Sequence, residues 1–183
     1  MKKSFVFMAE GFEEIEALTI VDMLRRASMP VCMVSISDEY DVEGAHGVTV
    51  IADEIISEAD FSDAEWLILP GGMPGAANLN ACAPLISILK AQNEAKGNIA
   101  AICAAPFILG EHGMLQGKNA TCYPGFEDRL KGANYTGAPV ERDGNIITGN
   151  GPAQAISFSA AIIEKSLGAP TSRRVLEGMM RNN

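Results

Sequence analysis

A chain of 183 residues, 48% of them apolar and 20% charged, can bury one sizeable α/β core but is too short for two full domains. We therefore expect residues 1–183 to form a single domain. The formal charge of −9 disfavours nucleic acid as a partner, and no apolar run is long enough to span a membrane. The four cysteines have no metal-ligand spacing with the two histidines, and no signal peptide is readable. These features predict a cytoplasmic protein with free thiols and no catalytic metal.

Short apolar runs alternate with helix-patterned segments along the chain. The expected strands are Ser4–Met8, Val31–Ile36, Val48–Ile51, Trp66–Leu69, Ile99–Ile102 and Ala120–Cys122. The expected helices begin near Glu13, Pro84, Ala104 and Pro152, with a last one over Thr171–Met180. Val140–Arg142 and Ile146–Thr148 flank Asp143-Gly144, which predicts a β-hairpin rather than part of the parallel core. This order predicts a three-layer α/β sandwich with a mainly parallel sheet and a site beyond the carboxyl ends of its strands.

Cys103 ends the apolar strand Ile99–Ile102, and a helix-like segment follows directly. That outline is typical of a nucleophile elbow, where the neighbours of the nucleophile must be small, as Ala104 and Ala105 are. A helix N-terminus favours thiolate over thiol, so we expect the pKa of Cys103 to lie well below that of a free thiol. A plain buried cysteine in an alanine-rich core is the alternative interpretation.

Paired glycines, Gly71 and Gly72, follow the strand Trp66–Leu69 after a proline. Glycine lets backbone N–H groups come close to a ligand. The N–H groups of Gly72 and Ala104 are therefore candidates for an oxyanion hole beside Cys103. An ordinary turn after a strand would give the same pattern.

Three glutamates open the helix that follows the first strand: Glu13, Glu14 and Glu16. The helix dipole favours acidic residues there, and for Glu13 and Glu14 we expect no more than this solvated role. Glu16 precedes the apolar face of the helix and is expected to turn inward and meet Cys103. A carboxyl beside a thiolate tends to stay protonated and to donate a hydrogen bond to sulfur, which raises its own pKa.

Five segments together resemble the ThiJ/PfpI superfamily, in particular the branch with the Parkinsonism-associated protein deglycase and its bacterial thiamine-locus relatives. The segments, in order and at similar spacing, are Gly11–Glu16, Val21–Arg26, Leu69–Gly72, Ala100–Pro106 and Gly149–Pro152. The resemblance implies that Cys103 is the reactive cysteine, that Glu16 touches its sulfur, and that Gly72 and Ala104 supply backbone donors. It also implies a flavodoxin-like sandwich and a homodimer.

The sequence departs from the superfamily pattern at three positions. Ala104 stands where protease-like members carry a histidine base, which argues against a Cys-His protease. Tyr123 stands where some members bring a histidine to the site, and His46 stands where close relatives carry an arginine beside the cysteine pocket. We take Gly71, Tyr123 and His46 as candidate substrate contacts, with rim packing as the alternative for Tyr123 and the role of His46 left open.

The resemblance implies a cofactor-independent enzyme that handles reactive aldehydes, with glyoxalase III-like or protein deglycase activity on methylglyoxal or early glycation adducts. Cys103 would be the nucleophile and Glu16 its proton shuttle. The alternative is an oxidative-stress sensor or chaperone in which Cys103 is oxidised to a sulfinate without turnover. A binding module that merely kept the fold is the third option.

Overall fold

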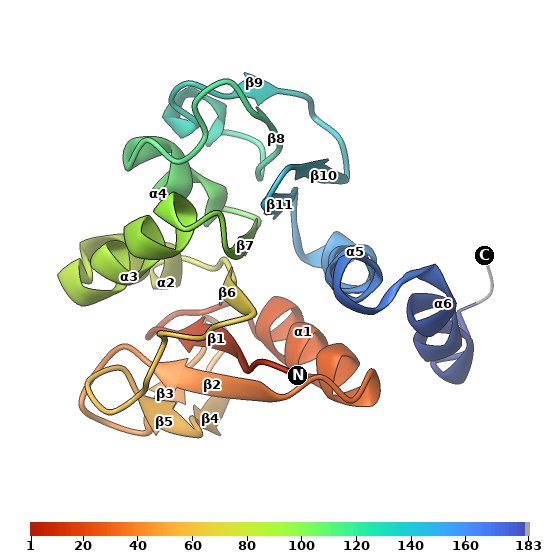
Figure 1. Cartoon of the computed structure of the whole chain (residues 1–183). Helices are drawn as coiled ribbons and strands as arrows, with labels where there is room; N and C mark the ends of the chain where they lie inside the picture. The colour runs from red at the N-terminus through yellow and green to blue at the C-terminus, as the bar shows by residue number, and fades with distance from the viewer. Residues whose placement is uncertain (182–183) are drawn as a thin grey trace.

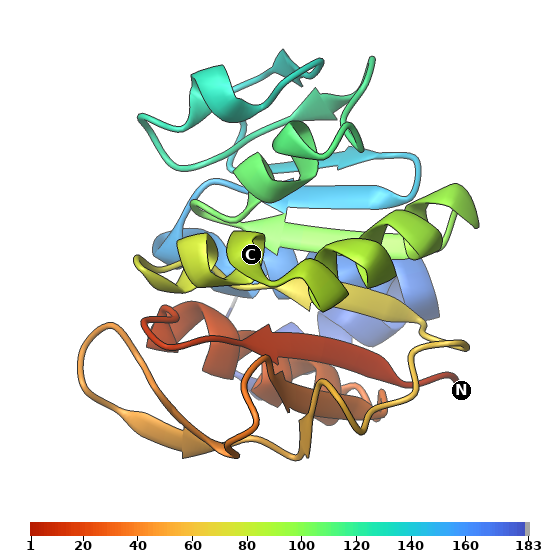
Figure 2. The same cartoon turned by 90° about the vertical axis from the view of Figure 1, so that its left-hand side faces the viewer.

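The computed structural model describes residues 1–181, and these form a three-layer α/β sandwich (Figures 1 and 2). Within this range the central sheet has seven strands in the order β10-β11-β7-β6-β1-β2-β5. All neighbouring strands pair in parallel except β10, which is antiparallel to β11. The strands are β1 (Ser4–Met8), β2 (Val31–Ser35), β5 (Glu54–Ile55), β6 (Trp66–Leu69), β7 (Asn98–Ile102), β10 (Val140–Asp143) and β11 (Ile146–Gly149).

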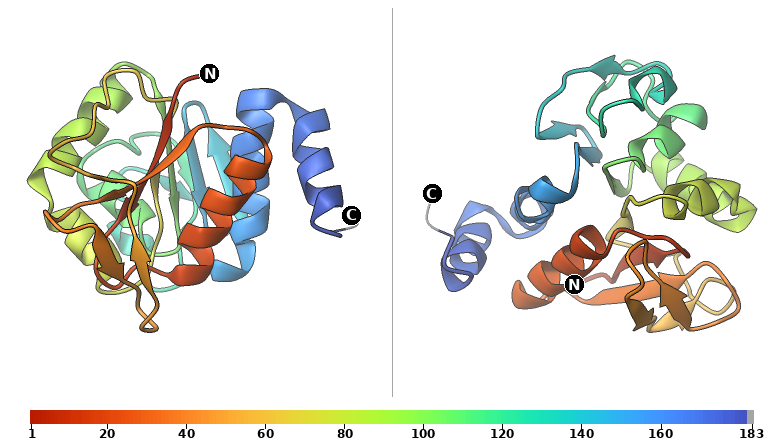
Figure 3. Two further views of the ribbon diagram at one scale, coloured as in Figure 1. Left: turned by 90° about the horizontal axis from the view of Figure 1, so that it is seen from below. Right: turned by 180° about the vertical axis from the view of Figure 1, so that it is seen from behind.

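Helices cover both faces of the sheet, as the left panel of Figure 3 shows. On one face lie α1 (Glu14–Arg26) and α5 (Ala155–Leu167), with α6 (Ala169–Gly178) packed outside α5. On the other face lie α2 (Gly75–Ala81), α3 (Ala83–Glu94) and α4 (Pro106–Glu111). The shorter elements are β3 (Asp41–Glu43), β4 (Thr49–Ile51), β8 (Asn119–Ala120), β9 (Asn134–Tyr135) and the 3₁₀ turns η1 (Glu127–Arg129) and η2 (Pro152–Gln154).

Both faces of the central strands are apolar because each face packs against helices. Along β1, Phe5 and Phe7 contribute to the core on the α2–α4 side, whereas Val6 and Met8 contribute to the core on the α1–α5 side. This alternation follows the two-residue period of a strand. Phe158 of α5 is fully buried in the second of these cores. The expected fold class, α/β with a flavodoxin-like three-layer sandwich and a mainly parallel sheet, is confirmed.

The structure corrects the expected position of the hairpin. Asp143-Gly144 does connect two antiparallel strands, but β11 also pairs in parallel with β7 and therefore belongs to the central sheet. Two other expected strands lie outside that sheet, because β4 pairs only with β3 and β8 pairs only with β9. The helix α2 was not predicted at all.

Several expected helix starts are shifted by a few residues. The segment expected to be helical from Ala104 passes through a turn first, and α4 begins at Pro106. The helix expected from Pro152 begins with the 3₁₀ turn η2 before α5. The last two positions of the predicted domain, 182 and 183, lie outside the described residues. No helix within residues 1–181 is long and apolar enough to cross a membrane.

The burial of Phe158 predicts a large loss of stability on truncation. The Phe158→Ala variant should lose about 3–5 kcal/mol of unfolding free energy, because it removes a ring from a packed core and leaves a cavity. Tyr135→Ala is the control, since 42% of Tyr135 is exposed, and should change stability far less. Urea unfolding followed by circular dichroism measures both. Equal losses in the two variants would contradict the packing described here.

Candidate active site

Three neighbouring parallel strands bring the predicted site residues to one edge of the sheet. The strands β1, β6 and β7 lie side by side and point the same way, so the segments after them emerge together. The segment after β1 leads to Glu16 in α1, the one after β6 contains Gly71 and Gly72, and the one after β7 begins with Cys103. The candidate active site therefore lies at the carboxyl ends of the strands, as expected for this architecture.

Cys103 sits in a strained turn that the surrounding backbone holds in place. Its φ angle is 63°, in the left-handed region that residues with side chains rarely adopt. The Cys103 N–H donates to the Gly149 carbonyl at 2.9 Å, and the Cys103 carbonyl accepts the Tyr123 N–H at 2.8 Å. These two hydrogen bonds hold the backbone of Cys103 in place, and the residue is only 8% exposed. The nucleophile-elbow geometry is thus present.

Glu16 is completely buried and lies against the Cys103 sulfur. The Gly71 N–H donates to Glu16 Oε2 at 2.7 Å, whereas Oε1 is buried without a hydrogen bond of good geometry to the described residues. Gly71 has to be glycine at this point. A Cβ there would lie 2.6 Å from the Cys103 Cβ and 2.8 Å from Glu16 Oε2, closer than atoms pack.

Two backbone donors reach the sulfur, as the sequence suggested. The N–H groups of Gly72 and Ala104 lie near the Cys103 sulfur and act to lower the pKa of its thiol. Gly72 has a φ of 90° and packs against the backbone of Gly11 and Phe12, so that its N–H is held rigidly. A negative charge that develops at or next to the sulfur meets two fixed dipoles.

The protonation of the pair differs from the expectation for the thiol. Burial raises the pKa of Glu16 to about 7, the direction expected. Burial also raises the pKa of Cys103, to about 12, and the negative charge of Glu16 contributes to that rise. The expected depression of the Cys103 pKa is therefore wrong. The short helix α4 begins three residues after the thiol, and the two backbone donors are outweighed by burial and by the neighbouring carboxylate.

The pair consequently shares one proton over a wide pH range. Above a pH of about 7 it carries a single negative charge, and loss of a second proton is opposed by the first charge. Above that pH the thiol donates toward an ionised Glu16. A carboxylate whose pKa lies near neutrality is well suited to accept that proton when the sulfur attacks.

Glu13 and Glu14 are not solvated, contrary to the sequence expectation. Only 9% of Glu13 and 8% of Glu14 are exposed. Glu14 Oε1 accepts the His46 backbone N–H at 2.6 Å, and Oε2 contacts His46 Nδ1 at 2.7 Å. Although burial acts to raise the pKa of Glu14, these hydrogen bonds hold it below its usual value, and they raise the pKa of His46. Glu14 therefore anchors the turn that carries His46.

One group of potential metal ligands occurs among the described residues. Single ligand atoms of Glu13, Glu14 and His46 all lie within 4.8 Å of one another. Within this group the His46 ring is already hydrogen-bonded to Glu14. The expected absence of a catalytic metal stays a prediction.

Tyr123 lies near the site, whereas Cys122 and His112 have structural positions. Tyr123 is 46% exposed, and its ring lies over Gly151, where a Cβ would be 3.3 Å away. Its backbone contact with Cys103 places it at the rim of the site. Cys122 is fully buried, and His112 is the C-cap residue of α4. Sequence reasoning missed the role of the Gly149 carbonyl, although the segment Gly149–Pro152 had been singled out.

Comparison with known proteins matches residues 2–165 to the model of the DJ-1/PfpI family. This chain is 38% identical to DJ-1 homolog B of Arabidopsis thaliana. The match covers 91% of this chain but only 39% of the length of that relative. It is 34% identical to the Parkinson disease protein 7 homolog of Danio rerio, covering 95% of this chain and 94% of the relative.

Two further matches cover nearly whole chains. A Caenorhabditis elegans protein named glutathione-independent glyoxalase is 31% identical over 92% of this chain and 90% of its own. The crystal structure of a DJ-1 superfamily protein from Salmonella typhimurium superimposes with a TM-score of 0.95 at 31% identity, covering both chains completely. Family model, sequence relatives and fold agree, and this chain belongs to the DJ-1/PfpI family.

Proposed function

We propose that this protein is a cysteine-dependent enzyme that converts small reactive aldehydes, such as methylglyoxal, without an external cofactor. The observation that carries the proposal is the contact between a clamped Cys103 thiol and a buried Glu16 whose pKa lies near neutrality. The printed name of the Caenorhabditis elegans relative, a glutathione-independent glyoxalase, supports the same class of reaction. Early glycation adducts on proteins are the second substrate class, since they form by addition of a protein group to the same aldehyde carbon. We place this activity in the cytoplasm.

The first step is attack of the Cys103 sulfur on the aldehyde carbon. The thiol proton passes to the Glu16 carboxylate, a C–S bond forms, and the carbonyl oxygen becomes a hemithioacetal oxygen. The N–H groups of Gly72 and Ala104 face the sulfur and are placed to stabilise charge on that oxygen. Glu16 then returns its proton to the oxygen and is again a base.

The second step moves hydrogen within the substrate. Glu16 removes the C–H proton of the hemithioacetal and returns it to the neighbouring carbon, while the hydroxyl proton of the hemithioacetal passes to the former ketone oxygen. The former aldehyde carbon becomes a thioester and the ketone becomes an alcohol. One carbon is oxidised and its neighbour is reduced, and no external oxidant is needed. Water then cleaves the thioester, which releases a 2-hydroxy acid and restores the thiol.

The second candidate function is redox sensing through Cys103. Glu16 Oε1 is buried without a good hydrogen bond and lies in the carboxyl group that contacts the sulfur. An oxygen added to the sulfur could accept a hydrogen bond from protonated Glu16 and from the two backbone donors. If the protein is a redox sensor, peroxide should convert Cys103 selectively to a sulfinate, and no aldehyde turnover should be observed.

We also propose a homodimer formed through the start of α1 and the β3–β4 hairpin. Ile15 is 59% exposed and Leu18 38% exposed, three residues apart on one face of α1. Val48 and Ile51 on the hairpin side are 48% and 70% exposed. The loop of the hairpin contacts the start of α1 through the Glu14–His46 hydrogen bonds, and exposed apolar side chains on both elements suit burial against a second copy.

The catalytic proposal predicts the behaviour of two variants. Lactate formation from methylglyoxal should be abolished in Cys103→Ser and should fall by about 10²–10⁴-fold in Glu16→Gln, because glutamine cannot accept the proton. Cys82→Ser and Glu94→Gln are matched controls away from the site and should retain activity. Lactate is measured enzymatically after removal of the protein. Full turnover in Cys103→Ser would exclude the mechanism, and sulfinate formation without turnover in the wild type would support sensing.

The shared proton predicts a pH dependence. The rate of Cys103 alkylation by iodoacetamide should rise as the pH increases through about 7, because ionised Glu16 accepts the thiol proton above that pH. In Glu16→Gln this inflection should disappear, because glutamine has no proton to lose in this range. Mass spectrometry of the Cys103 peptide separates this thiol from the other three. An unchanged inflection in Glu16→Gln would show that Glu16 does not control the thiol.

The dimer proposal predicts a change of mass. The wild-type chain should sediment at about twice 19.4 kDa, and Ile15→Asp with Leu18→Asp should reduce it to 19.4 kDa, since two charges would have to be buried. Tyr135→Asp, at an exposed position on the small β8–β9 sheet, is the control. A wild-type monomer at micromolar concentration would refute the dimer.

A further inference from the structure

A second candidate site lies at the end of the sheet opposite Cys103. A cavity of 560 Å³ opens there, which we call the lysine pocket; it is lined by Asn93, Lys96, Asn98, Lys118, Gly144, Asn145 and Lys165. Asn98 begins β7, and Cys103 directly follows the end of the same strand. At the rise of a β-strand this separation is roughly 16 Å. The lysine pocket is therefore distinct from the thiol site.

Two of its ammonium groups converge on one tight turn. Lys165 Nζ donates to the Gly144 carbonyl at 2.9 Å, and Lys118 Nζ lies 3.5 Å from the Asp143 carbonyl. These carbonyls belong to consecutive residues, so both side chains reach the β10–β11 turn, one from α5 and the other from the segment before β8. The Lys118 side chain is only 23% exposed, which reduces the solvent available to its charge.

The positive charge of the lysine pocket is poorly compensated. Among the described residues, one carboxylate forms an ion pair with a lysine of the pocket: Asp143 Oδ1 lies 3.9 Å from Lys118 Nζ, and Asp143 Oδ2 already accepts the Asn119 N–H at 2.9 Å. Within residues 1–181, neither Lys96 nor Lys165 has a carboxylate within 4.0 Å. Three ammonium groups thus face one carboxylate in a chain whose overall charge is −9. Like charges gathered in this way favour an anion between them.

Amide side chains give the pocket a second kind of recognition. Asn145 Nδ2 donates to Asn93 Oδ1 at 3.2 Å and to the Gly97 carbonyl at 2.9 Å, and Asn98 Nδ2 donates to the Glu65 carbonyl at 3.3 Å. These bonds hold the two amides in place. The side-chain oxygens of Asn98 and Asn145 accept no hydrogen bond from the described residues, so they remain able to accept one from a hydroxyl or amino group.

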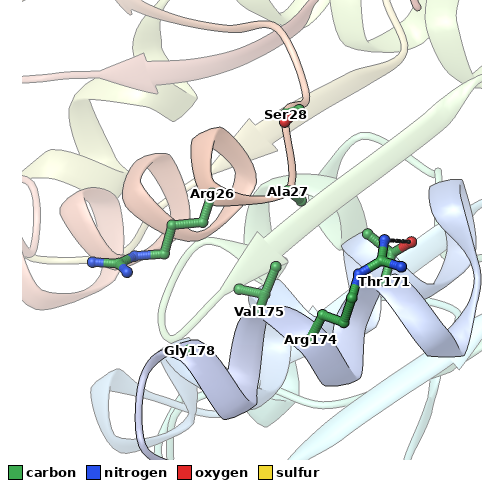
Figure 4. A pocket seen from close by; sticks show the side chains of 7 residues that line it. All are labelled: Arg26, Ala27, Ser28, Thr171, Arg174, Val175 and Gly178. Atoms are coloured by element: carbon green, nitrogen blue, oxygen red, sulfur yellow. Dashed lines mark hydrogen bonds between the residues drawn. The ribbon is translucent and has the colours of Figure 1, made fainter.

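Another cavity with two cationic residues does not offer this convergence. It has a volume of 340 Å³ and lies between the end of α1 and α6. In Figure 4 the Arg26 side chain extends away from Arg174, and Arg174 is bonded to Thr171. Arg26 Nε pairs with Asp22 at 2.6 Å, and Arg174 donates to Thr171 Oγ1 at 3.2 Å. The two arginine side chains of this cavity therefore point apart, and each already has a hydrogen-bond partner.

We propose that the lysine pocket binds a small phosphorylated molecule with at least two negative charges. Lysine ammonium groups bind phosphate oxygens as point charges, and three of them at one opening suit a diphosphate better than a monocarboxylate. The amide oxygens of Asn98 and Asn145 would contact the uncharged part of the molecule. The volume of the cavity is within the range of small-molecule sites.

Titration calorimetry with inorganic pyrophosphate and with a nucleoside diphosphate tests the proposal. Both probes should bind the wild type at low salt and bind more weakly as salt is added. Tighter binding of the nucleoside diphosphate would show that the amides contribute, and equal binding would limit recognition to the phosphates. The double variant Lys96→Gln and Lys165→Gln should lose at least about tenfold in affinity for pyrophosphate, since two of three cations are removed.

The matched control is the double variant Lys90→Gln and Lys131→Gln, which removes the same charge from exposed positions outside the pocket. It should keep the wild-type affinity. Equal losses in both double variants, or no pyrophosphate binding by the wild type, would overturn the proposal. Amide NMR of the wild type provides a measurement that needs no variant: the shifts induced by pyrophosphate should centre on Gly144 and Asn145, and shifts confined to other residues would also overturn it.

Discussion

The site depends on one contact, in which a fully buried carboxyl group is pressed against a thiol. Two acids in contact away from water cannot both ionise easily, so Glu16 and Cys103 act as a unit that holds or releases one proton near neutral pH. The arrangement avoids the need for a histidine. In the proposed mechanism the resting sulfur stays largely protonated, and its proton passes to Glu16 as the new bond forms.

Close packing of backbone makes this contact possible. Gly71 has no room for a side chain beside Cys103 and Glu16, and its N–H occupies Glu16 Oε2. Gly149 and Tyr123 hold the strained turn at Cys103 from either side. Gly71 follows β6 and Gly149 ends β11, both strands of the central sheet, so the rigidity of that sheet is passed to the thiol, whereas Tyr123 comes from the segment after β8 of the small sheet.

The parts of the site that sequence could predict are those that follow from strand ends. Glu16, Gly72 and Cys103 each come shortly after a buried strand, and parallel strands bring such segments together. The direction of the Cys103 pKa could not be predicted in this way, since it depends on how deeply the thiol is buried and on the charge of its partner. The burial of Glu14 could not be predicted from the sequence either, because it requires the turn at His46, 32 residues away, to fold over the start of α1. The same holds for the hairpin, where the local pattern revealed the turn but not the pairing of β11 with β7.

The negative charge around the thiol favours entry of a neutral substrate and release of an anionic product. Glu13, Glu14 and Glu16 all lie at the opening of α1, and Glu13 adds to the field that raises the pKa of Glu16. An aldehyde such as methylglyoxal carries no charge and enters this field without penalty, whereas a carboxylate formed there is repelled by the glutamates. In the proposed reaction, conversion of an uncharged dicarbonyl to a hydroxy acid would therefore couple the chemistry to release of the product. The proposed lysine pocket presents positive charge at the opposite end of the sheet, so the two ends of one fold suit ligands of different charge.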